Sequence, residues 1–154
     1  MSDASQPKVF SHILIPLENS AADETILRQV RPLAKLTGAR LTLIHVADGF
    51  MARNQNNLAE SREMAEDREY LTDRVHELTG EGFTVESVLE CGEPAARIVA
   101  FATEKKCDLI AMATHGHRGL SDIVLGSVAN SVRHQTDIPV LLARVAMAGK
   151  KKSE

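Results

Sequence analysis

The sequence predicts an α/β fold: a single doubly wound sheet of five parallel strands in the order 3-2-1-4-5, with helices on both faces. Three observations predict it. Short runs rich in β-branched residues alternate along the chain with longer amphipathic segments. Most of these runs are apolar at nearly every position, which is typical of strands buried on both faces. Glycine or proline separates most segments. We expect this domain to cover 8–146, between a disordered start (1–7) and a basic disordered tail (147–154).

The chain begins with a strand and a helix. Residues 9–16 (VFSHILIP) form a short apolar run, and we expect a buried strand there. A turn and a helical pattern follow, with apolar residues from Ile26 to Ala34 and a stop at Gly38. Pro32 lies inside this pattern and removes one backbone N–H, so we expect a kink or a helix in two pieces.

The second strand is predicted over 41–46 (LTLIHV). A polar connection over 47–57 leads to a long charged helix over 58–78, whose apolar residues recur at helical spacing. We interpret its charged face as solvated surface. The third strand, 83–90, alternates polar and apolar residues, which favours a place near the edge of the sheet.

The second half repeats the pattern. Pro94 suits the first turn of a third helix. The fourth strand is predicted over 107–113, the fourth helix starts near Gly126, and the last strand covers 140–145 (VLLARV). The order is therefore strand and helix four times, then a final strand.

Composition excludes several classes of function. The chain has 154 residues, 44% of them hydrophobic, which fits one domain with a proper core. A net charge of -3 and 3% aromatic residues argue against binding nucleic acid. No apolar run approaches the roughly 18 residues of a membrane span, and the first residues carry no apolar signal segment, so we expect a cytoplasmic protein without membrane insertion. Cys91 and Cys107 lack metal-ligand spacing and are expected to be free thiols.

The segment 112–128 (MATHGHRGLSDIVLGSV) carries the main functional signal. It predicts the end of a strand, a loop with glycines, and a helix start. At such a junction, unpaired N–H groups and the positive end of the helix dipole suit a phosphate. Ser127 would add a hydroxyl donor or simply cap the helix. The glycines could equally serve turns alone.

The predicted fold gives this loop its context. In open α/β sheets, ligands bind beyond the carboxyl ends of the strands, where the strand order reverses. That point lies between the first and fourth strands, flanked by 16–18 and by 113–127. The cations His115 and Arg118 lie close to the loop in sequence, where they would help to hold an anion.

These residues resemble the universal stress protein family. Its nucleotide-binding branch carries Gly-x2-Gly-x9-Gly-Ser/Thr after the fourth strand, a frame that matches Ala113, Gly116, Gly126 and Ser127 here. The segments ILIPLENS, LIHV and IPVLLAR also match, so the resemblance covers nearly the whole chain. Ala113 stands where the family has its first glycine, and Glu18 stands where it usually has Asp.

The resemblance implies ATP or another adenine nucleotide as the cofactor and allows Mg²⁺ beside its phosphates. Pro16, Val46 and Met112 would frame the adenine, and Glu18 would act near the adenosine. Gly116, Gly126, Ser127 and Val128 would supply donors to the phosphates, and Ala113, at the first position of the motif, would also belong to the site. The resemblance also implies a homodimer formed through the last strand, Val140–Val145.

Three functions remain open from the sequence. The first is an ATP-binding stress-response module that signals to an unknown protein partner, without fast hydrolysis because a Walker-type lysine is absent. The second is a nucleotide-free interaction module in which Ala113 and Glu18 mark a lost site. The third is a slow ATPase or autophosphorylating protein with Ser127 as acceptor. No catalytic constellation follows from the residue spacing, and the acids of 58–78 do not form a metal-binding pattern.

Overall fold

The computed structural model describes residues 9–48, 58–115 and 126–145. The predicted disordered ends (1–7 and 147–154) and most of the polar connection lie outside the described residues. So do two of the predicted site residues, Gly116 and Arg118.

Five parallel strands form one sheet in the order β3-β2-β1-β4-β5, which confirms the predicted fold class and strand order. The strand-helix alternation explains why all pairs are parallel, since each helix returns the chain to the same end of the sheet. β1 pairs along its whole length with β2, and it pairs with β4 on its other side through Ile13 and Leu14. The elements are β1 (His12–Pro16), α1 (Ala22–Thr37), β2 (Arg40–Asp48), α3 (Leu58–Gly80), β3 (Val85–Gly92), α4 (Pro94–Glu104), β4 (Leu109–Thr114), α5 (Ser127–Gln135) and β5 (Val140–Arg144).

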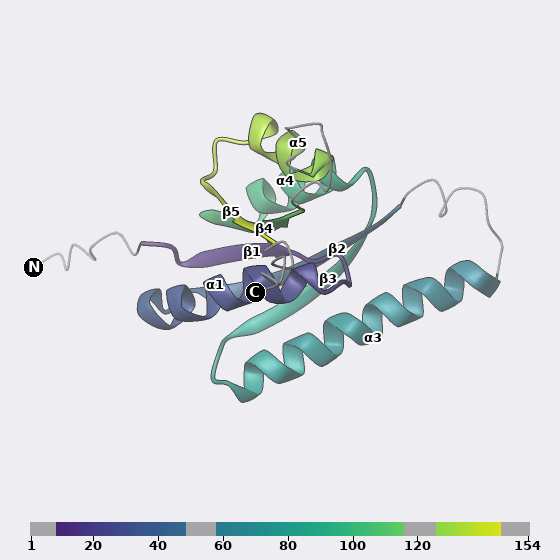
Figure 1. Cartoon of the computed structure of the whole chain (residues 1–154), viewed down its shortest axis with the longest axis horizontal. Helices are drawn as coiled ribbons and strands as arrows, with labels where there is room; N and C mark the ends of the chain where they lie inside the picture. The colour runs from purple at the N-terminus through teal and green to yellow at the C-terminus, as the bar shows by residue number, and fades with distance from the viewer. Residues whose placement is uncertain (1–8, 49–57, 116–125, 146–154) are drawn as a thin grey trace, which may run out of the picture.

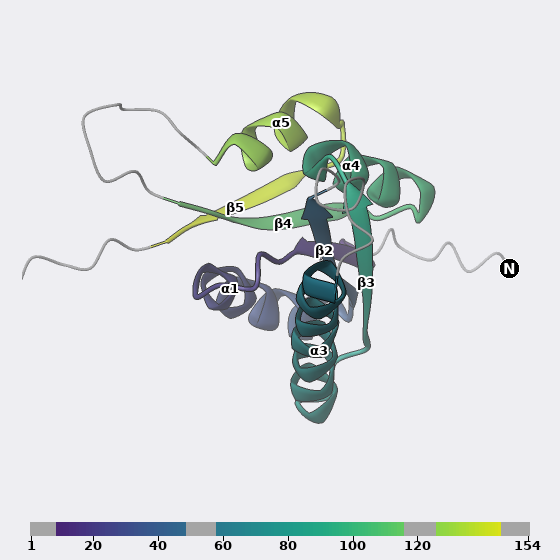
Figure 2. The same ribbon diagram turned by 90° about the vertical axis from the view of Figure 1, so that its right-hand side faces the viewer.

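Helices cover both faces of the sheet. Figures 1 and 2 show α1 and α3 on one side and α4 and α5 on the other. Because successive side chains of a strand point to opposite faces, β1 supplies both cores. Ile13 and Ile15 pack toward α1 and α3, whereas Leu14 packs toward α4 and α5. All three are fully buried, so β1 is the apolar centre of the molecule.

Of the two alternatives predicted for Pro32, a kink or a helix in two pieces, the second is wrong. α1 is a single helix of 16 residues with Pro32 inside it. Pro32 and Arg28, whose carbonyl loses its partner four residues on, are both exposed, so water can satisfy that carbonyl. On the opposite side, Ile26, Leu27 and Val30 are fully buried against the sheet. Burial of this face stabilises the helix across the proline.

Several predicted boundaries move by two or three residues. β1 starts at His12 rather than 9, because Phe10 has a φ of 55° and so lies outside the extended region. β3 covers Val85–Gly92 rather than 83–90, and β4 starts at Leu109. The prediction that the third strand lies near a sheet edge is confirmed, since β3 is the outermost strand of the sheet order and, within the described residues, pairs only with β2.

A chain of hydrogen-bonded polar side chains crosses the amino ends of the strands, with His12 and Thr42 buried at its centre. The Arg40 guanidinium can only donate, so its Nη2, at 3.3 Å, makes His12 Nδ1 an acceptor. His12 Nε2 therefore carries the proton and donates to Thr42 Oγ1 at 2.7 Å. The Thr42 hydroxyl donates in turn to Glu86 Oε1 at 3.2 Å. In this arrangement both ring nitrogens of the neutral His12 side chain have a hydrogen-bond partner. Burial, followed by the charge of Arg40, lowers the pKa of His12 below 6.5.

We expect the free energy of unfolding to fall as the pH drops below 6.5, because the unfolded chain then binds the His12 proton more tightly than the folded chain does. Above that pH His12 is neutral in both the folded and the unfolded chain, and its contribution to the free energy of unfolding no longer changes with pH. His12→Gln keeps a donor and an acceptor but cannot titrate, so its stability should depend less on pH. Urea unfolding of both proteins between pH 7 and pH 5 measures this.

Equal pH slopes in wild type and His12→Gln would contradict this account. Asp108 does not interfere in that window. Burial acts to raise the pKa of Asp108, but hydrogen bonds from the Ser11 and His12 amides outweigh it and hold the pKa below 3.8. Its contribution is therefore lost only at lower pH.

Candidate functional site

A cavity of about 380 Å³ opens at the carboxyl ends of the strands, beside the neighbouring strands β1 and β4, where the strand order reverses. Every predicted site residue that the structure describes lines it: Pro16, Glu18, Val46, Met112, Ala113, His115, Gly126, Ser127 and Val128. The position agrees with the rule for doubly wound sheets. Leu17, within the predicted flank 16–18, also lines the cavity, and sequence reasoning missed the remaining lining residues: Asp23, Ile44, His45, Pro94, Ile98 and Ala129.

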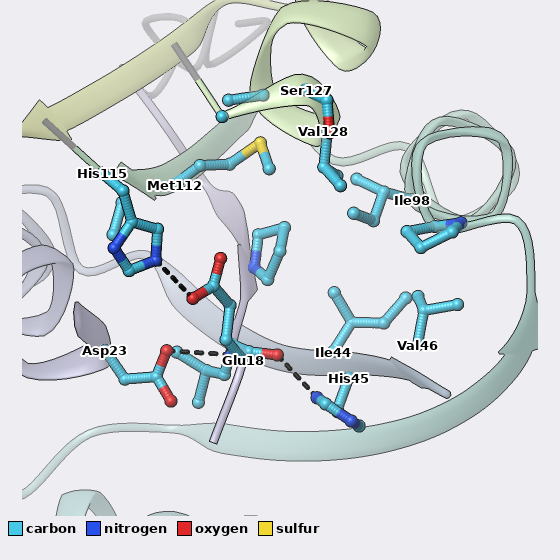
Figure 3. Close-up of a pocket in the computed structure, with 16 residues that line it drawn as sticks. Glu18, Asp23, Ile44, His45, Val46, Ile98, Met112, His115, Ser127 and Val128 are labelled. Atoms are coloured by element: carbon cyan, nitrogen blue, oxygen red, sulfur yellow. Dashed lines mark hydrogen bonds and ion pairs between the residues drawn. The ribbon is translucent and has the colours of Figure 1, made fainter. Parts of the chain in front are cut away.

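One side of the cavity is an apolar slot. Figure 3 shows Ile44 and Val46 of β2 on one wall, with Met112 of β4 and Val128 of α5 across from them, and Ile98 of α4 closing the end. Ile44, Met112 and Ile98 are at most 5% exposed, so packing fixes the walls. A flat apolar group of a ligand can lie between them.

The other side of the cavity is the amino end of α5. Gly126 is its N-cap residue, with φ of -35° and ψ of 135°, and no side chain of the described residues caps the helix. α4 differs, because its Glu93 side chain accepts hydrogen bonds from the Ala95 and Ala96 amides. In the described part of the chain, the first amides of α5 therefore have no acceptor. They form a site for an anion, strengthened by the helix dipole.

The interpretation of Ser127 as the N-cap of this helix is wrong. The cap position is taken by Gly126, and Ser127 is the first helical residue. Its side chain is exposed and lines the cavity. The hydroxyl is thus left available to a ligand rather than used by its own helix.

A contact between a carboxylate and an imidazole forms part of the cavity lining. His115 follows β4 and Glu18 follows β1, and His115 Nε2 lies 2.7 Å from Glu18 Oε2. Figure 3 shows the two side chains pointing toward each other. The same carboxylate oxygen accepts a longer hydrogen bond, 3.3 Å, from the Ser20 hydroxyl. Both members of the pair are about half exposed, so the pair is solvated and weak.

Asp23, near the start of α1, holds the turn that carries Glu18. Its carboxylate is 1% exposed and accepts hydrogen bonds from three successive backbone amides, those of Glu18, Asn19 and Ser20, at 2.9 to 3.2 Å. The Tyr70 hydroxyl of α3 donates to the same carboxylate. Burial and this hydrogen bond raise the pKa of Tyr70 to about 12. An acid in the first turn of a helix, just after a short turn, was the sequence signal for this role.

A second bridge joins α3 to the same turn. His45 Nδ1 donates to the Leu17 carbonyl at 2.7 Å, and His45 Nε2 lies 3.2 Å from Asp67 Oδ2. The Asn19 amide group donates to Asp67 Oδ1 at 3.2 Å. The interpretation of the charged face of 58–78 as solvated surface is therefore wrong for Asp67, which is 8% exposed. Nothing in the local sequence distinguishes Asp67 from the neighbouring acids.

The described residues offer little for other chemistry. They contain no group of three or more His, Cys, Asp or Glu side chains placed to hold a metal ion. Cys107 Sγ lies 3.6 Å from His12 Nδ1, but burial raises the pKa of the thiol to about 11. A thiol in that state is a poor nucleophile. Among the described helices, none is long and apolar enough to cross a membrane.

Comparisons with known proteins identify close relatives of this architecture. Universal stress protein MJ0531 of Methanocaldococcus jannaschii is 32% identical over 142 residues, which cover 88% of this chain and 83% of that protein. The solved structure of protein MJ0577, from the same organism, superposes with a TM-score of 0.78 at 28% identity, covering 88% of this chain and 96% of that one.

A further solved structure is that of the universal stress protein from Archaeoglobus fulgidus in complex with dAMP. It superposes with a TM-score of 0.68 at 25% identity, over 88% of this chain and 98% of that one. The sequence model of the universal stress protein family (Usp) matches residues 10–144, nearly the whole of the described fold. By its sequence, its strand order and its solved relatives, this chain belongs to the universal stress protein family.

Proposed function

We propose that this chain binds an adenine nucleotide, with ATP as the first candidate, in the cavity between β1 and β4. The protein would act as a cytoplasmic module of a stress response whose occupancy signals to a protein partner. Turnover of the nucleotide would be slow or absent, because the sequence has no Walker-type lysine. The observation that carries the proposal is the pairing of an apolar slot with a helix amino end that no described side chain caps.

The two halves of the cavity match the two halves of a nucleotide. The slot between Val46 and Met112 would take the base, and the strand end at Pro16 would border it. Gly126, Ser127 and Val128 would offer donors to the phosphates. Glu18 and His115 line the same cavity and would border the ribose and the first phosphate.

The predicted roles of the remaining residues complete this proposal. Gly116 and Arg118 would add an amide and a cation to the phosphate cradle, and Ala113 would border it from the end of β4. Mg²⁺ would accompany the phosphates rather than occupy a site built by the protein alone. The dAMP complex of the Archaeoglobus fulgidus relative supports the choice of an adenine nucleotide.

A homodimer formed through Val140–Val145 belongs to the same proposal. β5 (Val140–Arg144) is the last strand in the sheet order, paired only with β4. An unpaired strand edge is a natural place for a second copy of the chain to bind. Val140, Leu141 and Leu142 are only partly buried by their own chain, which leaves apolar surface for that contact.

One alternative has a specific observation in its favour. Glu18 and His115 of the cavity lining already contact each other, and Ala113 adds a methyl group where the family motif has glycine. In a nucleotide-free protein-interaction module of the same fold, Glu18 and His115 would stay in contact because no ligand displaces them. A partner that binds equally well with and without ATP would favour this alternative.

Isothermal calorimetry of the purified chain with ATP tests the proposal. We expect saturable binding of ATP, weaker binding of GTP, and release of an adenine nucleotide when freshly purified protein is denatured and analysed by mass spectrometry. Gln135→Glu is a matched control, because Gln135 lines a separate shallow cleft with Thr103 and Lys106 and should leave binding unchanged. Absence of binding to ATP, AMP and cAMP at millimolar concentrations would exclude the proposal.

A further inference from the structure

The Glu18–His115 pair differs from the other charged contacts around the cavity. Asp23 is committed to three backbone amides and to Tyr70, and His45 is held between the Leu17 carbonyl and Asp67. Those groups are nearly buried and cannot change partners without unfolding the turn. Glu18 and His115 are 53% and 54% exposed, and each can rotate into solvent. Among the described lining residues, this pair is the one able to exchange partners.

Its location makes such an exchange consequential. Figure 3 shows the Glu18 carboxylate beside His115 and facing the space that Met112 borders. His115 and His45 are the basic side chains among the described lining residues, and His115 lines the same cavity as the α5 amino end. A phosphate that reached the α5 amides would therefore meet His115 already engaged by a carboxylate. The two anions would compete for one imidazole.

The Glu18 carboxylate has a second hydrogen-bond donor besides His115. The Ser20 hydroxyl already lies 3.3 Å from the oxygen that contacts His115. After His115 turns away, the carboxylate keeps this hydrogen bond and gains water. Displacement would thus cost little more than the exposed ion pair itself, which is small.

We propose that Glu18 is an internal competitor for His115, so that this carboxylate raises the nucleotide concentration at which the site fills. The inference rests on the proposed function and assigns Glu18 a role opposite to that of a ligand-holding residue. A neutral nucleoside does not need His115 and escapes the competition. A phosphorylated ligand must displace Glu18, so the pair makes the affinity depend on phosphate charge.

The test measures binding of adenosine and of ATP to wild type, Glu18→Gln, His115→Gln and the double variant by calorimetry. Glu18→Gln should tighten ATP binding roughly two- to fivefold, the range set by one solvated ion pair, and should leave adenosine binding unchanged. The gain should shrink in the His115→Gln background, because the group competed for is absent. Glu104→Gln is the charge-matched control, since Glu104 is exposed at the far end of α4 from Pro94.

Each outcome decides the question. If Glu18→Gln weakens ATP and adenosine together, Glu18 holds the ligand; this inference falls and the proposed function stands. A gain that persists undiminished without His115 also overturns the competition. If wild type shows no binding but Glu18→Gln binds ATP, the inference stands and the proposed function must be restated. If neither protein binds, removing the competitor reveals no site, and both fall.

Discussion

Gly126→Asp is expected to stabilise the fold slightly while abolishing most ATP binding. Aspartate at an N-cap accepts hydrogen bonds from the first amides of the helix, here those of Val128 and Ala129, and its charge interacts favourably with the helix dipole. The gain over glycine should be about 0.5 kcal/mol. The same carboxylate would occupy the place proposed for phosphate, so ATP affinity should fall on the order of ten- to a hundredfold.

The backbone at Gly126 accepts this change. Its φ of -35° is negative, and no heavy atom of the described residues lies within 4 Å of an added Cβ. Gly126→Asn is the matched control, because asparagine caps the helix equally well without the charge. The ratio of ATP affinities between the Asn and Asp variants, measured by calorimetry beside thermal unfolding, isolates the electrostatic effect. Equal ATP affinity in both would show that phosphate does not bind at the amino end of α5.

Asp23→Ala is expected to lower the free energy of unfolding by about 2–4 kcal/mol, because it removes the acceptor of three amides and of one hydroxyl at a position that is 1% exposed. The 17–20 turn, which borders the cavity at Leu17, would lose its anchor, so ATP binding should weaken as well. Urea unfolding followed by circular dichroism measures the stability change. Asp23→Asn keeps one acceptor oxygen, so its free energy of unfolding should lie between those of wild type and Asp23→Ala.

Tyrosine titration gives this prediction an independent readout. Tyr70 is the only tyrosine in the chain and there is no tryptophan, so tyrosinate absorbance reports on Tyr70 alone. Its pKa of about 12 should fall toward 10 in Asp23→Ala, though burial keeps it above that value. Asp73→Ala removes an exposed acid of the same charge from α3 and should change neither quantity. An unchanged Tyr70 pKa in Asp23→Ala would contradict the assigned role of the carboxylate.

Much of the fold could be predicted because buried parallel strands leave a plain record in the sequence. The run around Ile13 to Ile15 is apolar at every position, since both faces of β1 are covered. The right-handedness of strand-helix-strand connections reduces the possible topologies to a handful. The site position followed from the same rule, which brings Glu18 and Val128 to one cavity although 110 residues separate them in the numbering.

The misses share a physical cause. Asp67 is recognisable only from its partners, and the bond between Asp23 and Tyr70 joins residues 47 positions apart in the chain. The interruption at Pro32 was predicted from the free-energy cost of proline inside a helix, whereas burial of Ile26 and Val30 keeps α1 a single helix. Local patterns report propensity, but tertiary contacts determine which polar groups are buried. The ligand roles of the lining residues stay predictions until binding is measured.

The central claim is that the amino end of α5 holds the phosphates of a nucleotide whose base lies between β2 and β4. Amide nuclear magnetic resonance of ¹⁵N-labelled protein during an ATP titration tests it most directly. We predict that the amides of Ser127 and Val128 show the largest shifts and that Gly126→Asp suppresses them. The account is contradicted if these two amides stay unmoved while ATP shifts residues elsewhere, such as Lys106 and Cys107 at the opposite end of the sheet.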